Sequence, residues 1–194
     1  MVFPSRLLGP LVDPEGLAEG GALRLLDCGP ANGATLAYLA SFPCRLRVVD
    51  LAPSLERIDR ARRDPEEEWP QGRLEGELRR ALALPAGERF DGCLLWDCLH
   101  RLDLAGVRAL FAVLRSHLAP GARLHTFVAL NRALPLRARN YGIVRPDRLA
   151  VSPAAEELPY RHTQAALQGT FGDLQVRQAI LIGEGRVELL LAAP

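Results

Sequence analysis

The sequence predicts one α/β domain, residues 1–194, built around a mostly parallel sheet. Apolar strand-like segments alternate with helical segments along most of the chain, and this order produces parallel sheets joined by right-handed crossovers. A glycine-rich turn follows the first apolar segment. The chain ends in two apolar segments on either side of Gly183-Glu184-Gly185, which is typical of an antiparallel hairpin. A chain of 194 residues leaves little room for a second domain.

The first half of the chain supplies the elements around the glycine turn. Residues 1–21 are dense in glycine and proline, so they predict a short irregular leader. The turn Gly29–Gly33 separates an apolar strand from an amphipathic helix. The expected elements are a strand over 23–28, a helix over 34–41, a strand over 45–50, a helix from Ser54 to about Arg63, a solvated loop over 64–68, a weak strand over 73–76 and a short helix over 78–84.

The second half of the chain continues the alternation of strands and helices, and a proline-containing segment and a hairpin follow it. Residues 131–161 contain four prolines and no sustained period, so they predict a long functional loop. Asp103 and Thr163 are suitable N-caps for the helices that follow them. The expected elements are a strand over 90–98, a helix over 104–118, a strand over 122–130, a helix over 163–168 and two hairpin strands over 174–182 and 186–192.

Composition and charge exclude several classes of function. The 24 basic and 23 acidic residues give a net charge of +1, which argues against a polyanion partner such as nucleic acid. All basic side chains apart from histidine are arginines, so no lysine nucleophile is available. No segment has the apolar length of a membrane span or the pattern of a signal peptide, and we expect a cytoplasmic protein. The four cysteines lack paired spacing, so buried reduced thiols are expected and no metal site.

Three strand ends carry the residues that could form a site. Asp27 begins the glycine turn, where the backbone can approach a ligand closely. Asp50 closes the second strand about twenty residues later, at the usual distance for a carboxylate that accepts ribose hydroxyls. Trp96, Asp97 and His100 follow the central strand. Ligands bind at the carboxyl ends of parallel strands, so these groups predict one shared site.

From Leu23 to its end the chain resembles the class I S-adenosylmethionine-dependent methyltransferases, in particular the ubiquinone and menaquinone methyltransferase branch. The resemblance is carried by LLDCGPANG, VVDLAPS, RLEGELRRALALPAGERFDGCLLWDCLHRL, LFAVLRSHLAPGARLHTFV and YRHTQAALQGTFGDLQV, in this order. It implies S-adenosylmethionine as cofactor and a small-molecule acceptor. It also implies a Rossmann-like three-layer sandwich with a seven-stranded sheet and an antiparallel carboxy-terminal hairpin.

The resemblance assigns roles by motif position. Asp27, Gly29, Ala31 and Gly33 would surround the aminopropyl-carboxylate end of the cofactor. Asp50 would bind the ribose, Leu51 and Leu78 would contact the adenine, Glu77 would accept from the adenine amine, and Trp96 and Asp97 would line the methionine end. As a separate inference, Glu77 could simply favour a helix N-terminus, and Trp96 could simply belong to the core.

The sequence departs from the family pattern in two places. Ala31 stands where the family usually has its middle glycine. The leader is too rich in breakers for the helix that usually covers the site. We therefore expect either residues 131–161 or a second chain, in a homo-oligomer or heteromer, to cover the cofactor cleft; the alternative is a site that stays open.

Candidates for chemistry on the acceptor are fewer. His100 is the best candidate for a catalytic base because the ordinary pKa of histidine suits proton transfer near neutrality. The alternative is that His100 only caps or packs the turn before the helix that starts at Leu104. Tyr141, Tyr160 and His162 are secondary candidates. Residues 131–148 also carry an excess of arginines over Asp147, which fits either solvated surface or a site for an anionic acceptor; the arginines are Arg132, Arg137, Arg139, Arg145 and Arg148.

Two other classes of protein remain open from the sequence. A non-catalytic methyltransferase-like subunit, acting as a scaffold or partner-binding module, would explain the short leader and Ala31. A nicotinamide-dependent oxidoreductase would share a similar nucleotide-binding fold, but Gly29–Gly33 lacks the full G-x-G-x-x-G pattern.

Overall fold

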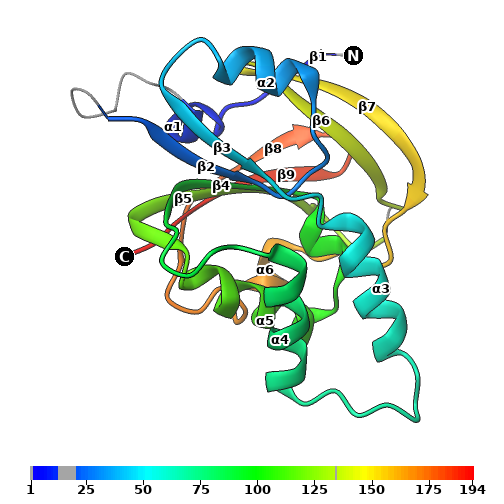
Figure 1. Cartoon of the computed structure of the whole chain (residues 1–194). Coiled ribbons are helices and arrows are strands. Elements are labelled where there is room, and N and C mark those ends of the chain that lie inside the picture. The colour runs from blue at the N-terminus through cyan, green and yellow to red at the C-terminus, as the bar shows by residue number, and fades with distance from the viewer. Residues whose placement is uncertain (1, 13–20, 134) are drawn as a thin grey trace.

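A six-stranded sheet forms the centre of the protein (Figure 1). The computed structural model describes residues 2–12, 21–133 and 135–194. Strands follow the order β3-β2-β4-β5-β9-β8, and β9 is antiparallel to both of its neighbours whereas β3, β2, β4 and β5 are parallel. The predicted mostly parallel sheet and the carboxy-terminal hairpin are therefore confirmed. The strands are β2 (Leu23–Asp27), β3 (Cys44–Val48), β4 (Phe90–Trp96), β5 (Leu118–Ala129), β8 (Gln175–Gly183) and β9 (Arg186–Ala192).

The segment predicted as a weak strand over 73–76 is helical instead. It lies inside α4 (Gln71–Leu82), whose buried Leu74, Leu78 and Leu82 recur every four residues. Arginine, leucine and glutamate are good helix formers, and this spacing aligns the three leucines on one face. Within the described residues the main sheet thus has six strands rather than the predicted seven, and β3 is an edge strand.

Helices cover one face of the sheet and bury the larger apolar core. Figure 1 shows these helices below the sheet. The side chain of Asp103 accepts a hydrogen bond from the backbone N–H of Gly106 (2.7 Å), and the Thr163 side chain accepts from Ala166 (3.3 Å), so both predicted caps are present. The helices are α3 (Ala52–Arg62), α4, α5 (Leu104–Arg115) and α6 (Gln164–Leu167).

The opposite face is covered by a second, three-stranded sheet of order β1-β7-β6 together with two short helices. The strands are β1 (Val2–Pro4), β6 (Arg137–Arg145) and β7 (Arg148–Glu157); the helices are α1 (Gly9–Val12) and α2 (Gly33–Leu39). The leader is therefore not irregular over residues 2–12, because β1 pairs with β7 and α1 buries Leu11 and Val12. Residues 13–20 of the predicted leader lie outside the described part of the chain.

The region predicted as a long loop is mostly the antiparallel hairpin β6–β7. Its prolines are compatible with strands because of where they stand. Pro146 lies in the turn, and Pro153 lies on β7 beyond Val2–Pro4, where β1 no longer pairs with that strand. None of the helices in the described residues has the length and apolar character needed to cross a membrane.

Candidate functional site

A pocket of about 260 Å³ lies where the carboxyl ends of β2 and β4 meet the hairpin β6–β7. This is the end of a parallel sheet at which ligands bind. The sheet side contributes Gly29, Asp50, Trp96 and Asp97, and the hairpin contributes Arg139 and Tyr141 among others. A larger hollow of about 560 Å³ lies at the opposite end of the sheet, beside the amino ends of β2 and β4, and contains none of the predicted site residues. We therefore assign the smaller pocket as the candidate site.

Asp27 organises the glycine turn at the end of β2. Its Oδ1 accepts hydrogen bonds from the backbone N–H of Gly29 (2.9 Å) and from Nε1 of Trp96 (2.7 Å). Burial raises the pKa of Asp27 to about 6. A positively charged ligand group beside this carboxylate would restore its usual acidity. Ala31 and Gly33 belong to the same turn, but they are exposed and do not line the pocket.

Trp96 has the most unusual conformation at the site. It ends β4 with φ of 49°, a left-handed conformation that a bulky side chain rarely adopts. Its ring stacks on Tyr141, with centroids 5.0 Å apart and planes 8° apart. A Cβ atom added to Gly29 would lie 2.8 Å from Cδ1 of Trp96, so only glycine allows the indole to approach this turn so closely. The indole thus occupies the space beside the turn.

Asp97 lies in the pocket lining and is held by a buried polar network. It pairs with Arg186 Nη1 from β9, and the Tyr141 hydroxyl donates to its two carboxylate oxygens at 3.2 and 3.1 Å. Burial raises the pKa of Asp97. Arg186 also donates to the backbone oxygen of Arg137, which joins β9 to the hairpin. Arg186 was not among the predicted site residues, although a lone arginine at the start of an apolar strand was a usable signal.

Asp50 and Leu51 are adjacent in the sequence, but only Asp50 lies at the pocket. The carboxylate of Asp50 is exposed at the pocket, and its Oδ1 accepts from the backbone N–H of Ala52 at 3.3 Å, which leaves the second oxygen directed away from this bond. Leu51 is fully buried in the core below α3 and does not line the pocket. Of these two predicted cofactor residues, only Asp50 is brought to the site.

An ion cluster that the sequence analysis missed closes one side of the pocket. Arg101 pairs with Glu56 of α3 and with Glu156 of β7, the latter at 2.8 Å. All three side chains line the pocket. Their positions in separate segments gave no local signal, because the cluster exists only when the hairpin lies against α3.

The two residues predicted to contact adenine are not at the pocket. Glu77 is on the outer face of α4, where it pairs with Arg57 (3.3 Å) and Arg80 (2.5 Å), and the hydrogen bond from Arg80 lowers its pKa. Leu78 is fully buried in the core. Because the segment is a helix interior rather than a strand end, the backbone N–H of Leu78 is used inside the helix and is not free for a ligand.

His100 is not placed to act as a base on a molecule in the pocket. It is fully buried and does not line the pocket. Its Nδ1 accepts from the backbone N–H of His162 at 3.3 Å, and burial lowers its pKa to about 3. His162 is buried beside it, and the hydroxyl of Tyr160 donates to Asp59 at 2.6 Å. Among the tyrosine and histidine candidates, only Tyr141 reaches the pocket.

The five arginines of residues 131–148 do not form one site. Arg139 lines the pocket and pairs with Glu184. Arg145 and Arg148 both face Asp147, in the turn of the hairpin (3.5 and 3.7 Å). Arg132 and Arg137 are exposed and do not line the pocket. Of these five arginines, only Arg139 lines the pocket, and it is already paired with Glu184.

Comparisons with known proteins give similarity at the level of structure. No protein-family model matches the sequence, and no curated protein matches it. The 1,6-didemethyltoxoflavin-N1-methyltransferase of Burkholderia thailandensis, bound to 1,6-didemethyltoxoflavin and S-adenosylhomocysteine, has a TM-score of 0.55 and 18% identity, over 97% of this chain and 77% of that one.

Two further solved structures are similar. The amino pentose methyltransferase CalS10 of Micromonospora echinaspora, bound to S-adenosylmethionine, has a TM-score of 0.52 and 18% identity, over 89% of this chain and 84% of that one. The N-methyltransferase NodS of Bradyrhizobium japonicum WM9 has a TM-score of 0.50 and 19% identity, over 96% and 92% of the two chains. Identities this low establish shared architecture only. The chain therefore has the fold of the small-molecule S-adenosylmethionine-dependent methyltransferases.

Proposed function

We propose that the protein binds S-adenosylmethionine in this pocket and transfers its methyl group to a small-molecule acceptor. The observation that carries the proposal is the convergence of the Asp27–Gly29 turn, Asp50 and the Trp96-Asp97 strand end on one pocket at the carboxyl ends of β2 and β4. The shared fold supports the same cofactor. The ubiquinone and menaquinone methyltransferase branch is supported by the sequence motifs alone.

The charges around the pocket suit a cationic cofactor. S-adenosylmethionine carries a sulfonium and an ammonium group, and when bound it supplies an electrophilic methyl group. The carboxylate of Asp50 lines the pocket and Asp27 lies directly behind Gly29, and neither has an ion-pair partner in the described residues; Asp97 also lines the pocket but is already paired with Arg186. In this proposal Asp50 accepts the ribose hydroxyls, and Asp27 orients the amino-acid end while its carboxylate regains a charge partner.

The hairpin supplies the part of the site that would contact the acceptor. Arg139 and Tyr141 face the pocket from β6 and Glu156 faces it from β7. An anionic group on the acceptor would compete with Glu184 for Arg139, and this one guanidinium is the remaining support for an anionic acceptor. The hairpin also covers the pocket from within the same chain, so the site does not require a second chain as its cover.

A second function is favoured by one specific observation. The Trp96 indole contacts Gly29 and donates to Asp27, so a side chain of the protein already occupies the place proposed for the amino-acid end of the cofactor. A non-catalytic methyltransferase-like subunit would keep this arrangement permanently. A methyltransferase requires Trp96 to turn away when the cofactor binds.

Calorimetry separates the two functions. We expect S-adenosylhomocysteine to bind the wild-type protein and NAD not to bind. Asp50→Ala should weaken S-adenosylhomocysteine binding by about 1.5 to 3 kcal/mol because it removes a charged acceptor of hydrogen bonds. Asp64→Ala, which changes an exposed acid outside the pocket, should leave the affinity unchanged. A folded protein that fails to bind S-adenosylhomocysteine would overturn the proposed methyltransferase and favour the non-catalytic subunit.

A further inference from the structure

The β3 edge of the main sheet is open in the described part of the chain. Leu23 N–H donates to Pro43 O (3.0 Å) and Val49 N–H donates to Asp27 O (2.8 Å), so every second residue between Pro43 and Val49 directs its backbone toward β2. The backbone groups of Cys44, Leu46 and Val48 consequently face away from the sheet. No described strand pairs with that side of β3.

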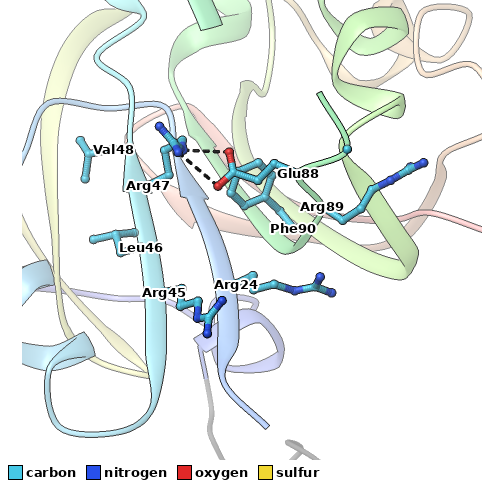
Figure 2. A pocket seen from close by; sticks show the side chains of 9 residues that line it. Arg24, Arg45, Leu46, Arg47, Val48, Glu88, Arg89 and Phe90 are labelled. Atoms are coloured by element: carbon cyan, nitrogen blue, oxygen red, sulfur yellow. Dashed lines mark hydrogen bonds and ion pairs between the residues drawn. The ribbon is translucent and has the colours of Figure 1, made fainter. Parts of the chain in front are cut away.

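Arginines line the hollow of about 560 Å³ that lies beside β3 at the amino ends of β2 and β4. Figure 2 shows Arg45 and Arg47 projecting from β3 on the side opposite Leu46 and Val48. Arg24 stands beside Arg45 on the neighbouring strand, and Arg89 lies across the hollow.

The charges in this hollow are only partly balanced. Arg24 pairs with Asp91 at 2.6 Å and Arg47 pairs with Glu88 at 2.9 Å. Within the described residues neither Arg45 nor Arg89 has an ion-pair partner, and Arg89 donates only to the backbone oxygen of Leu118 (3.2 Å). The β3 strand therefore combines one uncompensated guanidinium group, that of Arg45, with an outward row of backbone donors and acceptors that no described strand pairs, whereas Arg89 lies on the far side of β2.

This combination disfavours a second copy of the chain as the strand that completes the edge. An antiparallel pair of β3 strands centred on Leu46 would place Arg45 of each copy opposite Arg47 of the other. Like charges directly opposite each other destabilise a sheet, and charged edge residues prevent such pairing. A strand with carboxylates at these positions would be attracted instead.

We propose that β3 is a docking site for an extended acidic segment of a partner protein, which adds to the sheet as a further strand. Residues of an added strand alternate between the two faces. Acidic side chains at every second position would lie beside Arg45 and Arg47, and the apolar side chains between them would lie beside Leu46 and Val48. The site is at the opposite end of the sheet from the methyltransferase pocket, and the proposal does not depend on the proposed function.

Fluorescence anisotropy with a short labelled peptide of alternating glutamate and valine tests this inference on the full chain. We expect the peptide to bind at low ionic strength and to dissociate as salt screens the charges. Arg45→Glu should weaken binding by about tenfold or more. Arg177→Glu is the matched control, because Arg177 is an exposed arginine on the other edge strand, β8, and it should bind like the wild type.

A second pair of variants tests the backbone pairing. Leu46→Pro removes the outward N–H, whereas Leu46→Ala removes the same side chain and keeps the N–H. Circular dichroism checks that both fold. Binding retained by Leu46→Ala and lost by Leu46→Pro supports strand addition, and similar affinities for these two variants would overturn it.

Three other results would also overturn the proposal. A peptide with the same residues but all its glutamates in one block would bind equally well to a general anion site, so equal binding of that peptide would make the hollow such a site. Displacement of the labelled peptide by inorganic phosphate, at a concentration similar to that of the peptide, would lead to the same conclusion. Self-association of the wild-type chain that Arg45→Glu alters would make a second copy the occupant. Absence of peptide binding at low salt would leave the edge without this function.

Discussion

The buried carboxylate of Asp27 lowers the stability of the folded protein when it is charged. Two hydrogen bonds orient it, yet burial raises its pKa from 3.8 to about 6. The folded state binds the proton on Asp27 more tightly than the unfolded state does. This residue therefore makes its full contribution to folding stability below pH 4 and loses that contribution as the pH rises through about 6. At neutral pH the charged carboxylate therefore costs about 3 kcal/mol, the equivalent of this change in pKa.

Asp27→Asn should raise the stability of the ligand-free protein at pH 7 by ~1 to 3 kcal/mol, because the amide keeps an acceptor for Gly29 and Trp96 without the charge. The gain should shrink toward pH 4, where the wild-type carboxyl is protonated. Thermal unfolding of both proteins across this pH range measures the difference. A gain that is constant with pH would show that Asp27 is not the titrating group.

Local sequence patterns reveal some site residues and not others. Asp27, Gly29, Asp50, Trp96 and Asp97 were predicted because each stands at the end of a strand, and all but Asp27 line the pocket, with Asp27 directly behind it. No local sequence pattern shows whether a histidine side chain faces a pocket or the core. His100 was therefore predicted as a base although it is buried, and its lowered pKa follows from that burial.

At the scale of elements, the hairpin β6–β7 is attached to the rest of the protein by close contact with α2. A Cβ atom on Gly142 would lie 2.3 Å from Oδ1 of Asn32. That same oxygen caps α2 by accepting from the backbone N–H of Ala34 at 2.9 Å. A side chain at position 142 would thus force the helix to lose its cap.

Gly142→Ala should destabilise the protein by ~1 to 2 kcal/mol, about the value of an N-cap. The double variant Gly142→Ala/Asn32→Ser should recover most of this loss, since serine is a shorter side chain that still caps the helix. Asn32→Ser alone is the matched control and should be close to neutral. Urea unfolding of the four proteins checks the scheme, and an unrecovered double variant would place the clash elsewhere in β6.

Arg186 joins the hairpin to the main sheet through the buried Asp97. Replacing it with methionine leaves that carboxylate without its cation, and breaking a buried pair in this way costs ~3 to 5 kcal/mol. The double variant Arg186→Met/Asp97→Asn removes both charges and should be clearly more stable than Arg186→Met. Denaturant unfolding measures both, and equal stabilities would mean that the pair is not the source of the loss.

The elements that the sequence misassigned depend on long-range contacts. The alternating strands and helices of the main sheet were predictable because each carries its own apolar pattern. The prolines of residues 131–161 suggested a loop, and only the pairing of β7 with β1 and β6 explains why a strand accommodates Pro153. Residues 73–76 were misassigned for the same reason, because the packing of Leu74 and Leu78 into the core stabilises a helix rather than a strand.

For the whole molecule, the arrangement divides the site between two sheets. The main sheet provides the turn and the strand ends, and the small sheet covers them with β6 and β7. A prediction that a second chain covers the cleft rested on the absence of a covering element in the leader. The hairpin provides such a cover from within the chain, and the homo-oligomer or heteromer stays a prediction.

A ligand held between the two sheets should stabilise the hairpin against local opening. Amide hydrogen exchange with and without S-adenosylhomocysteine tests this. We expect slower exchange over residues 138–143 and at Cys28 and Gly29, on the two sides of the pocket, because a ligand that contacts both sheets lowers the population of the open form. Residues 175–180 of β8 are the internal control, since they lie in the described part of the chain outside the pocket lining. Slower exchange confined to Cys28 and Gly29, with the hairpin unchanged, would show that the ligand binds to the main sheet without contacting its cover.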